Sequence, residues 1–260
     1  METTPQIPKK AFTREGFTTD LSRRILESEE VISGVEGELY ANRIDNRSLT
    51  FKMVAADIAE RAHLDNDSKV LEVCCAAGQL ASELSAYVYS ENITATDGGV
   101  ELITAANKRY SSTGIHFKVE NVHDIDNEAK YDCVICKDSF HHFPDPAQAI
   151  KELMSPLKEG GVLYIFDLCR SAEPDQIESR ESIIVNDHEA MRFLRSINAS
   201  LTPEEFSEAA RLAGVESTEV IYPMQYSEKN LEKHKGDIDI DTTKEIELNT
   251  LFAVYILRKA

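Results

Sequence analysis

Short apolar runs alternate along this chain with longer segments in which apolar residues recur every three or four positions. The runs predict strands that are buried on both faces, and the helical spacing predicts amphipathic helices between them. The expected strands cover residues 70–73, 92–97, 115–119, 131–136 and 162–166. The expected helices begin near residue 78 and cover residues 100–109 and 146–157. This alternation predicts an α/β fold, with a parallel sheet covered by helices on both faces.

Two further helices are predicted ahead of the first strand, over residues 20–32 and 48–62. Asp20 is a suitable N-cap for the first helix, and Gly34 and Gly37 would end it. The second helix should pack against the sheet. The first either packs there as well or forms a lid over a pocket, with Tyr40 near its hinge. We therefore divide the chain into N-terminal helices with a lid, residues 1–64, and a main domain, residues 65–260.

The last quarter of the chain predicts one helix and two more strands. Thr202-Pro203-Glu204-Glu205 has the pattern of a capping box with proline at the first helical position. Gly214 would end the helix that follows. The two strands should cover residues 215–222 and 251–257, with an acidic insertion between them.

Small or polar residues follow each of the first four predicted strands. Residues 74–78 have little side-chain bulk, so a ligand could approach their backbone, although an ordinary strand-to-helix turn has the same pattern. Asp97 could accept two hydrogen bonds from a ribose diol, or it could be a solvated turn residue. Residues 121–124 and 137–142 follow the next two strands. Because ligands bind beyond the carboxyl ends of parallel strands, the four segments indicate one binding site.

The composition of the 260 residues is that of a globular protein, with 42% apolar residues and no apolar run of membrane length. The N-terminus lacks the apolar core of a signal peptide, so we expect a cytoplasmic protein without membrane attachment. The formal net charge of −18 argues against a nucleic-acid partner. Cys133 and Cys136 should point to opposite faces of a strand, so the sequence predicts reduced cysteines and no metal site.

Three consecutive motifs resemble those of the class I S-adenosylmethionine-dependent methyltransferases that act on small molecules. They are Tyr131-Asp132-Cys133-Val134-Ile135, Phe140-His141-His142-Phe143-Pro144-Asp145-Pro146 and Leu157-Lys158-Glu159-Gly160-Gly161-Val162-Leu163. The resemblance covers about residues 70–167 and, more loosely, the rest of the chain to the C-terminus. It implies a Rossmann-like doubly wound sheet of seven strands, mostly parallel with an antiparallel last strand. It also implies S-adenosyl-L-methionine as the cofactor.

The residues that the resemblance implies for cofactor binding lie at the four strand ends. They are Glu72, Cys74, Ala76, Gly78, Asp97, Gly98, Asn121, Val122, Cys136 and Lys137. Cys74 and Ala76 replace two of the three glycines of the family's first motif. Asp97 would bind the ribose and Asn121 the adenine amino group. Lys137 would lie beside the methionine part of the cofactor.

The chemistry of methyl transfer requires an acceptor that loses a proton, and His141 or His142 is the expected base. The alternative is that one histidine packs under the cofactor and the other fills the loop. In the enzymes that the chain resembles, substrate contacts lie in a cap, here about residues 168–200. The candidate substrate-binding residues are Tyr40, Arg180 and His188.

We expect the protein to transfer a methyl group to an oxygen or nitrogen atom of a small molecule, as a monomer or a homodimer. The replaced glycines leave a second hypothesis, a protein of the same fold that binds the cofactor without transferring its methyl group. A methyltransferase of protein substrates and a nicotinamide dehydrogenase are further alternatives. The missing glycines and the predicted last strand pair argue against a dehydrogenase.

Overall fold

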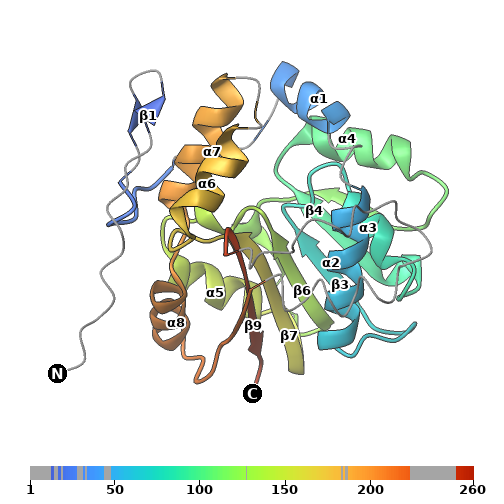
Figure 1. Ribbon diagram of the computed structural model, residues 1–260. Coiled ribbons are helices and arrows are strands. Elements are labelled where there is room, and N and C mark those ends of the chain that lie inside the picture. The colour runs from blue at the N-terminus through green and yellow to red at the C-terminus, as the bar shows by residue number, and fades with distance from the viewer. Residues whose placement is uncertain are drawn as a thin grey trace, which may run out of the picture.

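The computed structural model describes most of the main domain and part of the N-terminal segment (Figure 1). The described residues are 13–14, 17–18, 20–27, 32, 34–43, 48–126, 128–182, 184, 187–222 and 250–260. The acidic insertion before the last predicted strand lies outside these residues, apart from its flanks. No helix within the described ranges has the length and apolar character needed to cross a membrane.

Seven strands form one sheet in the order β5-β4-β3-β6-β7-β9-β8. They are β3 (Val70–Val73), β4 (Ile93–Asp97), β5 (His116–Val119), β6 (Tyr131–Lys137), β7 (Leu157–Leu168), β8 (Glu219–Ile221) and β9 (Phe252–Arg258). The first five of these strands pair in parallel, and β9 is antiparallel to both of its neighbours. The predicted Rossmann-like sheet with an antiparallel last strand is therefore confirmed. Two two-residue strands, β1 (Thr13–Arg14) and β2 (Phe17–Thr18), pair separately.

Helices cover both faces of the sheet, and each face has its own apolar core. The helices are α1 (Gly34–Arg43), α2 (Ser48–Arg61), α3 (Gln79–Leu84), α4 (Val100–Arg109), α5 (Pro146–Met154), α6 (Pro174–Ser182), α7 (Asp187–Ala199) and α8 (Pro203–Leu212). Ile58, Leu80 and Ile103 bring α2, α3 and α4 into one core, whereas Ile150 and Phe206 bring α5 and α8 into the other. The capping box that begins α8 is present as predicted.

The alternation of side chains along β6 explains why two of the cysteines do not pair with each other. Cys133 lies in the core under α2 and α3, and Cys136 lies in the core under α5 and α8. All five cysteines are free thiols. The prediction that residues 133 and 136 form neither a redox pair nor a zinc ligand pair is consistent with this placement.

The predicted helix at residues 20–32 is wrong. Residues 21–22 form a turn and residues 24–27 have no regular secondary structure, whereas the helix of this region, α1, begins at Gly34. Arg24 donates hydrogen bonds to the carbonyl oxygens of Ala199, His141 and Phe143. These tertiary bonds hold the segment extended across the ends of the sheet, which the local apolar spacing could not reveal.

The expected boundary between α5 and the fifth strand is also different. The helix ends at Met154, and Gly160 and Gly161 lie inside the long strand β7 instead of stopping a helix. Gly160 has φ +75°, a conformation that favours glycine, and the pairing register with β6 shifts near this point. The two glycines therefore form an irregular start to the strand.

Arg170 lies within the predicted cap, residues 168–200, and its side chain is fully buried among protein groups. Its guanidinium donates to the carbonyl oxygens of Ser200 (3.1 Å) and Leu21 (2.8 Å) and pairs with Glu205 on α8. The residue joins the N-terminal segment, the end of α7 and the start of α8. Its role is structural.

The substitution Arg170→Met should lower the free energy of unfolding by about 3–5 kcal/mol, because it leaves buried acceptors unpaired. Arg211→Met is a matched control, since Arg211 forms an exposed pair with Glu208 on the same helix. It should change the free energy by less than about 0.5 kcal/mol. Urea unfolding of both variants measures this, and equal effects would contradict the assigned role of Arg170.

Candidate functional site

The turn after β3 has an unusual backbone, in which every second residue is left-handed. Cys74 has φ +53°, Ala76 has φ +48° and Gly78 has φ +80°. These are the three positions that the resemblance aligns with glycines, and all three are left-handed although two of them are not glycine. At residue 78 glycine is required, because a Cβ atom there would lie 2.4 Å from the ring of Phe117. The turn therefore keeps two non-glycine residues in a left-handed conformation at some cost in strain.

Asp97, the last residue of β4, fastens this turn to the neighbouring strand end. Its carboxylate accepts hydrogen bonds from the backbone N–H groups of Ala76 (2.9 Å) and Gly99 (2.8 Å). Burial raises the pKa of Asp97, and these two hydrogen bonds oppose that shift. A carboxylate has about four acceptor positions, so two remain for a ligand. Gly98 lies between Asp97 and the donor Gly99, and it is half-buried like Asp97.

Glu72, on β3, pairs with Ala95 of β4 and so lies two residues deeper in the sheet than Asp97. Only 3% of its surface is exposed. Its Oε2 atom has no hydrogen-bond partner within the described part of the chain. Burial raises the pKa of Glu72 to about 8, although Lys137 at the end of β6 opposes the shift. An unpartnered buried carboxylate is costly for the folded protein and would be stabilised by a cation or a donor placed at the site.

The end of β6 supplies a buried cation and a buried thiol. Lys137 pairs with Asp138, and its ammonium group lies 5.1 Å from the ring centres of both Phe51 and Phe166. Cys136 is fully buried, and contact with the Cys74 thiol together with burial raises its pKa. The two thiols thus lie against each other between the ends of β3 and β6.

Asn121 and Val122 follow β5 at the same edge. The Asn121 side chain is exposed and caps the short helix Val122–Asp124, where its oxygen accepts from the N–H of His123 at 3.0 Å. Val122 is half-buried and packs against the core under α5. The second acceptor position of the Asn121 oxygen is compatible with the predicted contact to an adenine amino group.

His141 is held in one orientation by Asp167, near the end of β7. The Nδ1 atom of His141 lies 2.7 Å from Oδ1 of Asp167, and its backbone N–H donates to Oδ2 at 2.6 Å. Both side chains are buried. Burial lowers the pKa of His141, but the neighbouring Asp167 carboxylate outweighs it, so the pKa lies above its ordinary value. The arrangement leaves Nε2 as the ring nitrogen that does not face Asp167.

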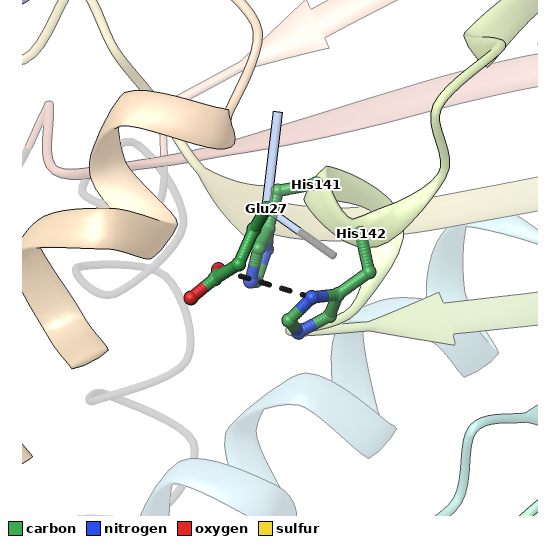
Figure 2. Close-up of side chains that lie close together, drawn as sticks. All are labelled: Glu27, His141 and His142. Atoms are coloured by element: carbon green, nitrogen blue, oxygen red, sulfur yellow. Dashed lines mark ion pairs between the residues drawn. The ribbon is translucent and has the colours of Figure 1, made fainter. Parts of the chain in front are cut away.

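His142 packs against His141, and its pKa is shifted in the opposite direction. The two rings are 4.2 Å apart between centroids. Burial and the adjacent His141 lower the pKa of His142 to about 4, so this ring is neutral at physiological pH. Its Nδ1 atom lies 3.8 Å from Oε2 of Glu27, which comes from the extended N-terminal segment (Figure 2). At that distance the contact is not a hydrogen bond.

Of the three candidate substrate-binding residues, the structure describes the side chains of two. Tyr40, on α1, is half-buried and packs on the cluster that contains Ala76 and Leu102, so it lies beside the turn after β3. Arg180 is half-buried on α6. His188 belongs to the first turn of α7, and its side chain lies outside the described residues. Contact of these three residues with a substrate stays a prediction.

Sequence reasoning missed the contributions of Glu27, Arg24 and Asp167. Glu27 and Arg24 were placed inside a helix that does not form, and Asp167 was seen only as the end of a strand. A carboxylate at the carboxyl end of a parallel strand was the signal for Asp167, since that end faces the site. Nothing in the local pattern of residues 20–27 indicates their position beside His142.

The strand order and the ligand-binding edge define a class I, Rossmann-like methyltransferase. The chain belongs to the methyltransferase domain family, whose model matches residues 64–233. It is similar to ubiquinone biosynthesis O-methyltransferase of Xanthomonas campestris pv. campestris, with 34% identity over 108 residues that cover 40% of this chain and 44% of the relative. Nodulation protein S of Azorhizobium caulinodans is 31% identical over 106 residues, 40% of this chain and 50% of that protein. The chain thus spans half or less of the length of these relatives.

Solved structures of methyltransferases have the same fold. The plantazolicin methyltransferase BpumL, in complex with a pentazolic desmethylPZN analog and SAH, superposes with a TM-score of 0.64 at 19% identity. The match covers 85% of this chain and 90% of that one. A possible histamine N-methyltransferase from Thermotoga maritima gives a TM-score of 0.54 at 17% identity, covering 86% of this chain and 97% of its own. At these identities the likeness concerns the fold alone.

The substitution Ala76→Gly should stabilise the protein by about 0.5–1 kcal/mol. Relief of the left-handed strain, about 1–2 kcal/mol, exceeds the entropy that glycine adds to the unfolded chain, about 0.4–1 kcal/mol. Ala105→Gly, in the middle of α4, is the control and should destabilise by about 0.5–1 kcal/mol. Chemical unfolding measures both, and a loss of stability in Ala76→Gly equal to that of the control would count against strain at residue 76.

The raised pKa of Glu72 predicts how stability depends on pH. Its folded pKa, about 8, is above the unfolded value, so ionisation is costly only in the folded protein. The contribution of Glu72 to stability therefore declines from about pH 4.5 to about pH 8 and is constant above that. Glu72→Gln should remove this decline and make the protein more stable than wild type at pH 9, by up to about 4 kcal/mol. Urea titrations at pH 5, 7 and 9 test this, and parallel pH profiles for the two proteins would refute it.

Proposed function

We propose that this protein transfers the methyl group of S-adenosyl-L-methionine to an oxygen or nitrogen atom of a small molecule. The observation that carries the proposal is the turn after β3, whose left-handed residues are fastened by the carboxylate of Asp97. Membership of the methyltransferase domain family supports it. Its similarity to an O-methyltransferase of ubiquinone biosynthesis and to a methyltransferase structure with bound SAH also supports it.

The hydrogen-bonding groups present suit the cofactor. Asp97 has acceptor positions left for a ribose diol, and the turn at residues 74–78 that it anchors lies beside it. The unpartnered Oε2 of Glu72 is free to accept a hydrogen bond from the ammonium group of the methionine end, which would favour the ionised carboxylate. Asn121 and Val122 are the proposed adenine contacts, and Cys136 and Lys137 the proposed neighbours of the methionine part.

The residues of the loop after β6 are proposed to act on the acceptor. Bound S-adenosyl-L-methionine supplies an activated methyl group, and the acceptor must lose a proton as it attacks. His141 presents Nε2 as a proton acceptor, while Asp167 fixes the ring and stabilises its charged form. His142 is neutral at physiological pH and packs against His141. We place proton removal at this pair.

The remaining proposals concern the substrate and the setting of the enzyme. Residues 168–200 are proposed to cap the substrate, with contacts from Arg180 and His188, and Tyr40 closes the site from α1. We also propose that the chain consists of an N-terminal part, residues 1–64, and a main domain, residues 65–260. The strongly acidic composition supports a protein without a nucleic-acid partner. Five free thiols support a reducing, cytoplasmic location, and a homodimer is proposed as the assembly.

The substitution Asp97→Asn should weaken the binding of S-adenosylhomocysteine by about 10–100-fold, because it removes a charge-assisted acceptor for two hydroxyls. Isothermal titration measures the affinity. Asp67→Asn is the control, since Asp67 is exposed in the turn before β3, at the opposite edge of the sheet. No measurable binding to the wild-type protein would overturn the proposed function, and equal affinities would overturn the role of Asp97.

The substitution His141→Gln should lower kcat by about 10²–10⁴-fold while the affinity for S-adenosylhomocysteine changes little, because the ring acts on the acceptor. The activity should be measured with a panel of phenols and amines as methyl acceptors. His116→Gln, on the exposed edge strand β5, should leave kcat unchanged. Tight cofactor binding with no turnover across the whole panel would favour a binding protein without transferase activity.

A further inference from the structure

We propose that Glu27, His141 and His142 form a binding site for one divalent transition-metal ion of the zinc type. Each of the three residues offers a ligand atom within 4.8 Å of the ligand atoms of the other two. Figure 2 shows the carboxylate and the two imidazole rings converging from two separate segments of the chain. The sequence alone predicted no metal site from the cysteines, and it placed Glu27 in a helix that does not form.

His141 is oriented as metal-binding histidines commonly are. Its Nδ1 atom is 2.7 Å from Asp167, and Asp167 is itself fixed by backbone N–H groups of His141 and Leu168. A carboxylate on one ring nitrogen sets the tautomer and leaves the other nitrogen as the ligand. Nε2 of His141 is therefore the donor that we assign to the ion.

His142 has a buried ring nitrogen that forms no hydrogen bond with the described part of the chain. Among the described residues Nδ1 of His142 has no hydrogen-bond partner, and its nearest acidic atom, Oε2 of Glu27, is 3.8 Å away. A buried nitrogen without a partner is costly, and a metal ion bound between it and the carboxylate would supply that partner. The unpartnered Nδ1 atom thus points to a ligand at the cluster, independently of the short distances between the three ligand atoms.

Glu27 is positioned by contacts and is not a loose surface carboxylate. Its side chain is 10% exposed, and the hydroxyl of Ser196 on α7 donates to its Oε2 atom at 3.2 Å. Three residues earlier, Arg24 donates to the carbonyl oxygens of His141 and Phe143. The loop that contains the two histidines therefore also binds the N-terminal segment, which contains Glu27.

The donor set selects the kind of ion. Two imidazole nitrogens and one carboxylate suit zinc and its neighbours, whereas magnesium and calcium prefer oxygen ligands only. With metal–ligand bonds of about 2.0–2.1 Å, tetrahedral donors lie about 3.3 Å apart. The observed separation of 3.8 Å between His142 and Glu27 is close to this, so small side-chain rotations would complete the site.

Three protein ligands leave a fourth position open, as in catalytic zinc sites. This part of the inference rests on the proposed function. The open position would take an oxygen atom of the methyl acceptor, and the ion would lower the pKa of that hydroxyl. Oxygen acceptors would then be preferred to amines. His141 would serve as a ligand that positions the ion when the metal is bound, instead of as a free base.

The test uses the full chain, stripped of metal by a chelator and then titrated with Zn²⁺ and with Co²⁺. We expect one ion per chain by equilibrium dialysis and visible d–d bands for Co²⁺ without a sulfur-to-metal charge-transfer band. Glu27→Gln and His142→Gln should each weaken binding by at least about 10-fold. The control His116→Gln removes one histidine, as His142→Gln does, and should bind the metal ion with the affinity of the wild type.

Three outcomes would overturn the proposal. They are an absence of saturable binding, equal affinity in wild type and both cluster variants, and a charge-transfer band that assigns the ion to cysteine. Circular dichroism checks that the variants are folded, and the near-isosteric Glu27→Gln keeps the test valid should His142→Gln not fold. Because metal binding is read without cofactor or acceptor, its failure is distinguishable from a failure of methyl transfer.

Discussion

The hydrogen bonds that the Asp97 carboxylate accepts from Ala76 and Gly99 are the constraint on which the site depends. They join the turn after β3 to the loop after β4, so the two strand ends that would hold a nucleoside move as one unit. The carboxylate is half-buried and anchored before any ligand arrives, which reduces the ordering that binding would otherwise require. The left-handed backbone at Cys74 and Ala76 persists because this anchor and the surrounding packing determine it.

A second carboxylate organises the other side of the site in the same way. Asp167 accepts hydrogen bonds from the backbone of His141 and holds its ring. Both carboxylates lie at carboxyl ends of parallel strands and both orient a neighbouring loop, one for the proposed cofactor and one for the proposed acceptor. The sheet order places β3 and β6 side by side between them, so the two functions meet at the centre of the sheet. The N-terminal segment, fastened by Arg24, adds Glu27 to the acceptor side.

The parts of the fold that follow local rules were predictable from the sequence. The continuous apolar runs gave the parallel strands, the helical spacing gave the start of α5, the capping box at Thr202 gave the start of α8, and α4 has the predicted bounds. The parts that depend on distant contacts were not. Residues 20–27 have helical apolar spacing, but the bonds of Arg24 to a loop far along the chain decide their conformation.

The candidate site shows the same division. Asp97 and the histidines could be located because they follow strands, and the resemblance to a family indicated their roles. The left-handed angles at Cys74 and Ala76 could not be inferred from the residues themselves, since cysteine and alanine rarely adopt them. The approach of Glu27 to His142 likewise requires the tertiary structure.

The central claim is that a nucleoside lies along this edge with its ribose on Asp97. The most direct test is a crystal structure of the protein with S-adenosylhomocysteine bound. The account predicts both ribose hydroxyls within hydrogen-bond distance of the Asp97 carboxylate, and the sulfur atom near the loop that carries His141. A structure in which the nucleoside binds elsewhere, or in which Asp97 contacts only the backbone while the ribose faces solvent, would contradict it.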